Sequence, residues 1–119
     1  MGKSILKDHS FKFAIEIIKL YNLLIESKKE YVLSKQLLKS GTSVGAMIRE
    51  AQNAESKNDF VHKLAIAQKE CDETMYWLEL LKESNYIELK EFTKIHDGAF
   101  SLLKMIRSSI LTTKQKANT

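Results

Sequence analysis

The chain has 119 residues, a formal net charge of +4, no proline, and a single cysteine that cannot form an internal disulfide. A hydrophobic fraction of 44% with 29% charged residues is ordinary for a globular protein and excludes a disordered chain. No apolar run approaches the roughly 20 residues that a membrane span needs, and the first residues lack the apolar core of a signal peptide. We therefore expect one cytoplasmic domain over residues 1–119, with frayed ends at about 1–7 and 114–119.

The first predicted helix covers about residues 8–28 and carries two apolar stripes side by side. Both follow three- and four-residue steps, which gives a wide apolar face suited to more than one neighbour. Either Ser10 or Asp8 can cap its start. One stripe is Phe11, Ile15, Ile18 and Ile25, and the other is Phe13, Ile17, Leu20 and Leu24.

After a polar break at residues 28–30, a second helix is predicted over about 32–54. Its unusual feature is two internal glycines, Gly41 and Gly45, each of which costs a helix about 1 kcal/mol relative to alanine. Four residues apart, they share one face, where another backbone can approach closely. The spacing predicts a helix-packing or subunit-interface contact. A phosphate loop is excluded because the Gly-Lys-Ser/Thr ending is missing.

The third predicted helix, about residues 59–83, has the most regular pattern in the chain. Ser56 or Asn58 can cap its start, and Asn85 can adopt the left-handed conformation that ends it. The fourth helix is expected over about 88–113, with apolar residues at helical spacing across Gly98. The seam of the third helix alternates four- and three-residue steps, as in bundles and coiled coils: Phe60, Leu64, Ala67, Cys71, Thr74, Leu78 and Leu81.

Four long amphipathic segments with short connections predict an all-α fold, an antiparallel up-down-up-down four-helix bundle.

Charge is distributed unevenly along these segments. Residues 57–85 carry two more acidic than basic residues, whereas residues 86–119 carry three more basic than acidic ones. Complementary packing between neighbouring helices would explain this pattern. The alternative is a basic outer surface that faces an acidic partner such as nucleic acid. Its candidate contacts are Lys90, Lys94, Lys104, Arg107, Lys114 and Lys116.

The residues that could support catalysis do not form the patterns that an enzyme would require. Glu70 and Glu73 lack the histidine three residues further on that a di-metal bundle site requires. Cys71 lies on the heptad seam with no neighbouring base to activate it. We therefore expect no catalytic residue, metal or cofactor. Glu70 and Glu73 are expected to pair with cations across an interface, and Tyr76 and Trp77 either stack on bases or belong to the core or a subunit interface.

Two stretches resemble a known family: residues 36–46, QLLKSGTSVGA, and residues 59–70, DFVHKLAIAQKE, the latter followed by the Glu-Thr pair at 73–74 and YWLELL at 76–81. They are similar to the bacterial four-helix-bundle family labelled ribosomal-RNA intervening-sequence protein, related to the accessory variability protein of diversity-generating retroelements. The likeness covers nearly the whole chain. One departure is Met47, where the family usually has an asparagine, so any role of that amide does not transfer.

The resemblance implies a homo-oligomer, most simply a pentamer, with no established enzymatic activity. Together with the basic charge, it favours a self-assembling bundle that binds RNA or a nucleoprotein. The alternative is a protein-interaction scaffold with no nucleic-acid role, and a remote alternative is a bundle enzyme or metal site.

Overall fold

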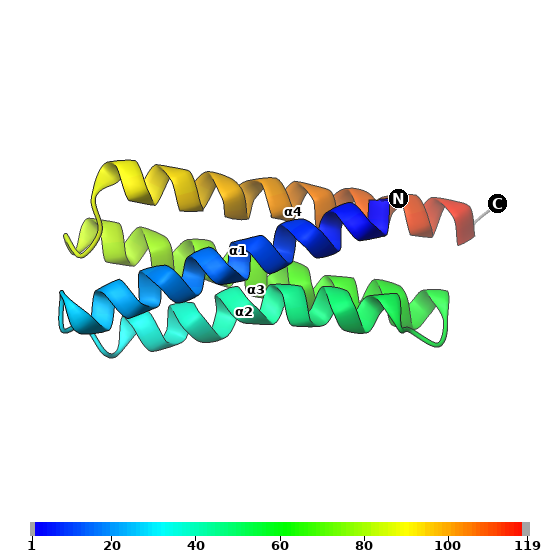
Figure 1. Ribbon diagram of the computed structural model, residues 1–119. Helices are drawn as coiled ribbons and strands as arrows, with labels where there is room; N and C mark the ends of the chain where they lie inside the picture. The colour runs from blue at the N-terminus through cyan, green and yellow to red at the C-terminus, as the bar shows by residue number, and fades with distance from the viewer. Residues whose placement is uncertain (1, 118–119) are drawn as a thin grey trace.

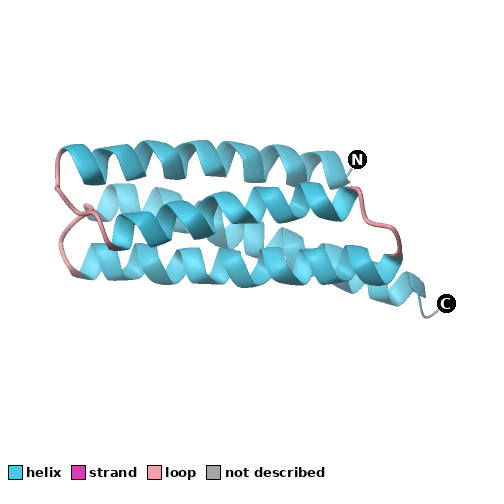
Figure 2. Ribbon diagram, turned by 90° about the horizontal axis from the view of Figure 1, so that it is seen from below, coloured by secondary structure: helices cyan, strands magenta, loops and turns pink. Residues whose placement is uncertain are grey.

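The computed structural model describes residues 2–117, which form four α-helices joined by loops. They are α1 (Gly2–Glu26), α2 (Leu33–Gln52), α3 (Lys57–Glu83) and α4 (Leu89–Ala117). Short loops reverse the chain after each of the first three helices, so consecutive helices run antiparallel (Figure 1). Over the described residues, Figure 2 shows helices and loops and no strand. The predicted antiparallel four-helix bundle is confirmed.

The helices surround one core in the order of the sequence. α1 packs against α2 and α4, and α3 packs against the same two helices, so α1 and α3 lie diagonally across the bundle. The predicted seam of α3 is buried from Leu64 to Leu81, while Phe60 at its start is partly buried. The regular apolar pattern of α3 is therefore sufficient to predict which of its residues face the core.

Both terminal helices are longer than the sequence pattern suggested. α1 begins at Gly2 rather than near Asp8, because Leu6 and Ser10 are buried and continue the helical spacing that leads to Phe13. α4 extends past Thr113 to Ala117. Helix thus covers residues 2–7 and 114–117, for which fraying was expected, and residues 1 and 118–119 lie outside the described part.

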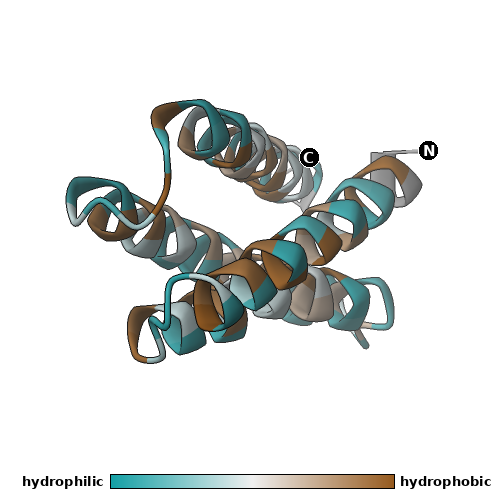
Figure 3. Ribbon diagram, turned by 60° about the vertical axis from the view of Figure 1, so that its left-hand side comes forward, coloured by the Kyte–Doolittle hydropathy of each residue, from teal (hydrophilic) through white to brown (hydrophobic). Residues whose placement is uncertain are grey.

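Only one of the two apolar stripes on α1 faces the core. Phe13, Ile17 and Leu20 are buried, and Leu24 lies beside them. The other stripe points outward: Phe11 is 59% exposed, and Ile15 and Ile18 are each 39% exposed. Figure 3 shows hydrophobic ribbon, in brown, along α1 where it crosses α2. We refer to Phe11, Ile15 and Ile18 as the outer stripe.

The two glycines of α2 lie at this crossing of α1 and α2. A Cβ on Gly41 would lie 2.8 Å from Cγ2 and 2.9 Å from Cγ1 of Ile17, which is closer than carbon atoms approach. A Cβ on Gly45 would lie 3.4 Å from the backbone oxygen of Ser10, an ordinary contact. The glycines therefore serve helix packing within the chain, and Gly41 is the position where a Cβ would clash with a side chain of α1.

Helix ends are defined by specific hydrogen bonds. Of the two predicted caps for α3, Ser56 is the one used, and its Oγ accepts from the backbone NH of Asp59 at 3.0 Å. Asn85 has φ 65°, as predicted for the residue that ends α3. The NH groups of Asn85 and Tyr86 donate to the carbonyls of Lys82 and Leu81, the pair of bonds that closes a Schellman motif.

Glu30 caps α2 from the preceding loop, a role that the sequence pattern did not reveal. Its carboxylate accepts hydrogen bonds from the NH groups of Val32 (3.1 Å), Leu33 (3.0 Å) and Ser34 (2.6 Å). Burial alone would raise the pKa of Glu30, but the bonds donated by these three backbone NH groups outweigh it. The pKa of Glu30 is therefore lowered from its ordinary value of 4.5, and the carboxylate is held ionised at the positive end of α2.

Alanine substitutions at the two glycines should change the free energy of unfolding by different amounts. Gly41→Ala gains helix propensity but forces the β-branched Ile17 to move, so we expect a net loss of about 1–2 kcal/mol in the free energy of unfolding. Gly45→Ala should be neutral or stabilising by up to about 1 kcal/mol, because little has to move. Urea unfolding followed by circular dichroism measures both. Equal destabilisation by the two variants would contradict the close contact at Gly41.

Glu30→Gln should lower the free energy of unfolding by about 1–2 kcal/mol at pH 7, since a neutral amide is a weaker acceptor for backbone NH groups. Because the folded pKa is lowered, this stabilisation is complete above pH 4.5 and is lost as the pH falls through the folded pKa. Urea unfolding at pH 7 and at pH 3 should therefore show a difference from wild type that shrinks in acid. Glu26→Gln, at the exposed end of α1, is the control and should have little effect at either pH.

Candidate nucleic-acid interface

All six basic residues predicted to contact nucleic acid lie on α4, and all are exposed. At about 3.6 residues per turn, Lys90, Lys94 and Lys104 fall along the side of α4 that faces away from the core. Arg107 and Lys114 lie on the flank nearer α3, and Lys116 lines a cavity at the end of the bundle. The residues form a broad band along the helix rather than one tight cluster, and the exposed Asp97 interrupts it.

Few of these cations are neutralised within the chain. Lys94 Nζ lies 3.4 Å from Glu16 Oε2 of α1, and Lys104 Nζ lies 5.0 Å from the centre of the Phe100 ring. Lys90, Arg107 and Lys114 have no ion-pair partner among residues 2–117. The band therefore presents positive charge to its surroundings.

Complementary packing of an acidic third helix against a basic fourth one explains little of this charge. Over the described residues, no lysine or arginine of α4 from Lys90 to Lys114 forms an ion pair with a carboxylate of α3. His96 supplies the one such contact, with Nε2 2.8 Å from Glu79 Oε2. The acidic groups of α3 and the lysines of α4 thus remain separate surface features.

The candidate interface residues of α3 lie on and beside its outer face. Trp77 Nε1 donates to Glu73 Oε2 at 3.4 Å, and the rings of Trp77 and Tyr76 are 5.1 Å apart at 64°. Trp77 is partly buried and packs against the core, whereas Tyr76 is 53% exposed. Glu70 is partly buried, and its backbone oxygen accepts from the Thr74 hydroxyl. Trp77 is thus in part a core residue, whereas Tyr76 lies on the surface.

Cys71 lies in the interior with no sign of a nucleophile's environment. Its thiol donates to the backbone oxygen of Ala99 at 3.1 Å, and it is fully buried. Burial raises the pKa of Cys71 to about 12, which keeps the sulfur protonated at neutral pH.

Within residues 2–117, no group of three or more His, Cys, Asp or Glu side chains is arranged to hold a metal ion. No described helix is long and apolar enough to cross a membrane.

Two features bear on the sequence interpretation. Met47, at the position of the family's usual asparagine, is partly buried and packs against the core, so an apolar contact occupies this place. The outer stripe of α1 was visible in the sequence only as the width of its apolar face. Which half would be exposed depends on the rotation of α1, and the contact of Ile17 with Gly41 sets that rotation.

Comparisons with known proteins agree with this architecture. The family model described as 23S rRNA-intervening sequence protein matches residues 3–108. A crystal structure of a protein of unknown function from the S23 ribosomal protein family of Bacteroides thetaiotaomicron is similar, with a TM-score of 0.91 and 46% identity. The similarity covers 92% of this chain and 98% of that one. Among curated proteins, none matches the chain.

Proposed function

Because the chain belongs to the 23S rRNA-intervening sequence protein family, we propose that it is a non-enzymatic, self-assembling bundle that binds structured RNA through backbone phosphates. The observation that carries this proposal is the basic band of α4. Lys90, Arg107 and Lys114 are exposed there without an ion-pair partner in the described chain. Cations of this kind gain free energy by displacing the counterions condensed on a nucleic acid.

Assembly would strengthen such binding. One subunit carries a formal net charge of only +4, whereas an oligomer concentrates several such charges on one particle. The name of the structural relative's family, S23 ribosomal protein, is consistent with a nucleoprotein setting. A duplex presents phosphates over a long stretch, so a broad band is better matched to it than to a single bound nucleotide.

The outer stripe of α1 supports self-assembly. Phe11, Ile15 and Ile18 form a continuous exposed apolar line on a helix, and such lines commonly mark protein interfaces. Tyr76 is exposed on α3, the helix diagonally opposite α1. Contacts between opposite faces of successive subunits are head-to-tail, and a head-to-tail contact forms a ring when the rotation between subunits closes, and an open filament when it does not. The resemblance implies five members in that ring.

A protein-interaction scaffold is the second candidate, and the same outer stripe favours it. In that case the stripe would bind a different protein, and the cations of α4 would only keep the surface solvated. The two functions differ in their response to salt, because phosphate contacts weaken steeply as salt rises whereas apolar contacts do not.

RNA binding is tested with two matched triple variants. K90Q/K104Q/R107Q removes three cations from α4, and K35Q/K39Q/R49Q removes the same charge from exposed positions on α2. We expect the α4 variant to flatten the dependence of log K on log salt by about 2 for a structured RNA, and the α2 variant to leave it nearly unchanged. Fluorescence anisotropy with a labelled hairpin measures both. The proposal is overturned if wild type shows no affinity at low salt, or if both variants lose binding equally.

Self-assembly is tested by absolute mass in solution, with and without RNA. Wild type should have a mass several times the 13.7 kDa of one chain. F11D/I18D should reduce the mass to that of one chain, because buried unpaired carboxylates are costly. L23D, at a 45% exposed position elsewhere on α1, is the control and should stay assembled. Circular dichroism establishes that each variant is helical. A wild-type mass of one chain at micromolar concentration would contradict the proposal.

A further inference from the structure

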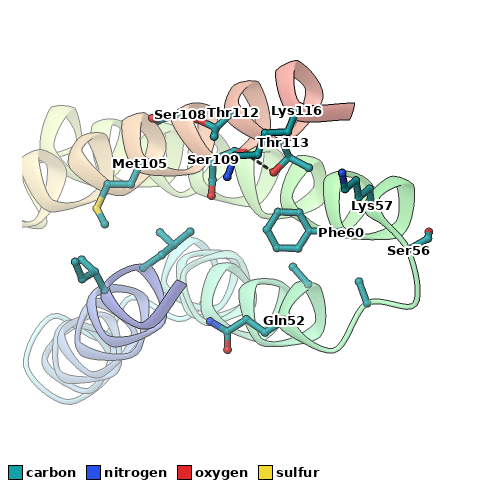
Figure 4. Close-up of a pocket in the computed structure, with 14 residues that line it drawn as sticks. Gln52, Ser56, Lys57, Phe60, Met105, Ser108, Ser109, Thr112, Thr113 and Lys116 are labelled. Carbon is teal, nitrogen blue, oxygen red and sulfur yellow. Dashed lines mark hydrogen bonds between the residues drawn. The ribbon is translucent and has the colours of Figure 1, made fainter. Parts of the chain in front are cut away.

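A cavity of about 840 Å³ opens at the end of the bundle where the chain terminates. At this end of the bundle, α4 extends beyond the start of α1 (Figure 1). The C-terminal part of α4 and the start of α3 line the cavity together with residues from the start of α1 and the end of α2. Figure 4 shows the side chains of both helices pointing into this space, with the ring of Phe60 at its centre. The cavity is separate from the basic band on the outer side of α4, with Lys116 the residue common to both.

The cavity has an apolar floor that includes one aromatic ring. Leu6 from α1 and Met105 from α4 line it together with Phe60, which is partly buried against the core. An aromatic ring beside aliphatic side chains provides a flat surface on which a planar group can stack. Stacking of this kind accepts any base, because every base has a π-face.

The rim of the cavity is polar and positively charged. Lys57 at the start of α3 and Lys116 near the end of α4 line it, and hydroxyl groups are supplied by Ser109 and Thr112. No carboxylate lines this cavity among the described residues. The nearby acidic residues Glu55 and Asp59 line the groove between α1 and α2 instead. The charges at this corner of the bundle are therefore segregated, and the end cavity is suited to an anion.

Four of the fourteen residues that line the cavity lie outside the part of the chain that the family model matches. That match ends at residue 108, whereas Ser109, Thr112, Thr113 and Lys116 all line the cavity. The last turns of α4 thus complete a cavity whose other lining residues lie within the matched segment.

We propose that this cavity binds one unpaired nucleotide of a structured RNA, an inference that rests on the proposed RNA-binding function. The base stacks against Phe60, the hydroxyl groups bond to the base or ribose, and Lys57 and Lys116 bind the flanking phosphates. Paired bases cannot enter, since they are held inside a duplex, whereas bases in bulges and loops can be splayed out. The basic band on α4 then holds the adjoining duplex, and the end cavity selects an RNA with an unpaired base.

Two RNA hairpins of identical stem sequence test the proposal, one fully paired in its stem and one with a single bulged adenosine. Wild type should bind the bulged hairpin about tenfold more tightly, as expected for one base stacked on an aromatic side chain. Phe60→Leu keeps an apolar side chain but removes the ring, and it should abolish this preference while leaving affinity for the paired hairpin unchanged. K57Q/K116Q should reduce the preference and flatten the salt dependence for the bulged hairpin.

Phe92→Leu is a matched control at the other end of the bundle. Phe92 is also partly buried near a helix start, and its NH donates to the Glu88 carbonyl at 2.9 Å just as the NH of Phe60 donates to Ser56. This variant should keep the tenfold preference. Equal affinity of wild type for both hairpins, or equal loss of preference in the two leucine variants, overturns the cavity proposal while leaving RNA binding intact. If neither hairpin binds at low salt, the proposed function itself fails.

Discussion

The contact between Ile17 of α1 and Gly41 of α2 is the constraint on which the arrangement of this bundle depends. An interior glycine lowers helix propensity, and the cost is offset here because the two helices can approach within a distance that any Cβ would block. The approach also sets the rotation of α1 about its own axis. With Ile17 pressed against α2, Phe13 and Leu20 turn inward and complete the core.

The same rotation determines what the surface of the protein offers. Because α1 carries apolar residues on two sides, burying one side leaves Phe11 and Ile18 exposed. α4 behaves differently, since its buried apolar residues share one side and its outer side is rich in lysine, although Leu89, Phe100 and Leu111 are also exposed. Two neighbouring helices of one small bundle therefore present different chemistries. In the proposed function, association uses α1 while α4 binds the anionic partner.

Local sequence patterns were sufficient to predict the fold, but they predicted less of the surface. The heptad seam of α3 and the capping potential of Ser56 and Asn85 depend on nearby residues, so the sequence predicted them correctly. The cap supplied by Glu30 was missed because Glu30 lies in the loop, three residues before the first residue of α2. The positions of the cations on α4 followed from helical periodicity. The end cavity did not, since it depends on where α1 begins relative to the end of α4, a tertiary relation that no single helix pattern contains.

The buried thiol of Cys71 has a consequence for the kind of assembly that this protein can form. It lies between α3 and α4 with its proton directed at the Ala99 carbonyl, and it is the only cysteine in the chain. A disulfide joins two sulfur atoms about 2 Å apart, so two copies could be cross-linked only after α4 separated from α3 in both. The proposed association of folded subunits therefore involves no disulfide between two copies of Cys71. An intersubunit disulfide in a preparation would therefore indicate that α4 had separated from α3 in the linked molecules.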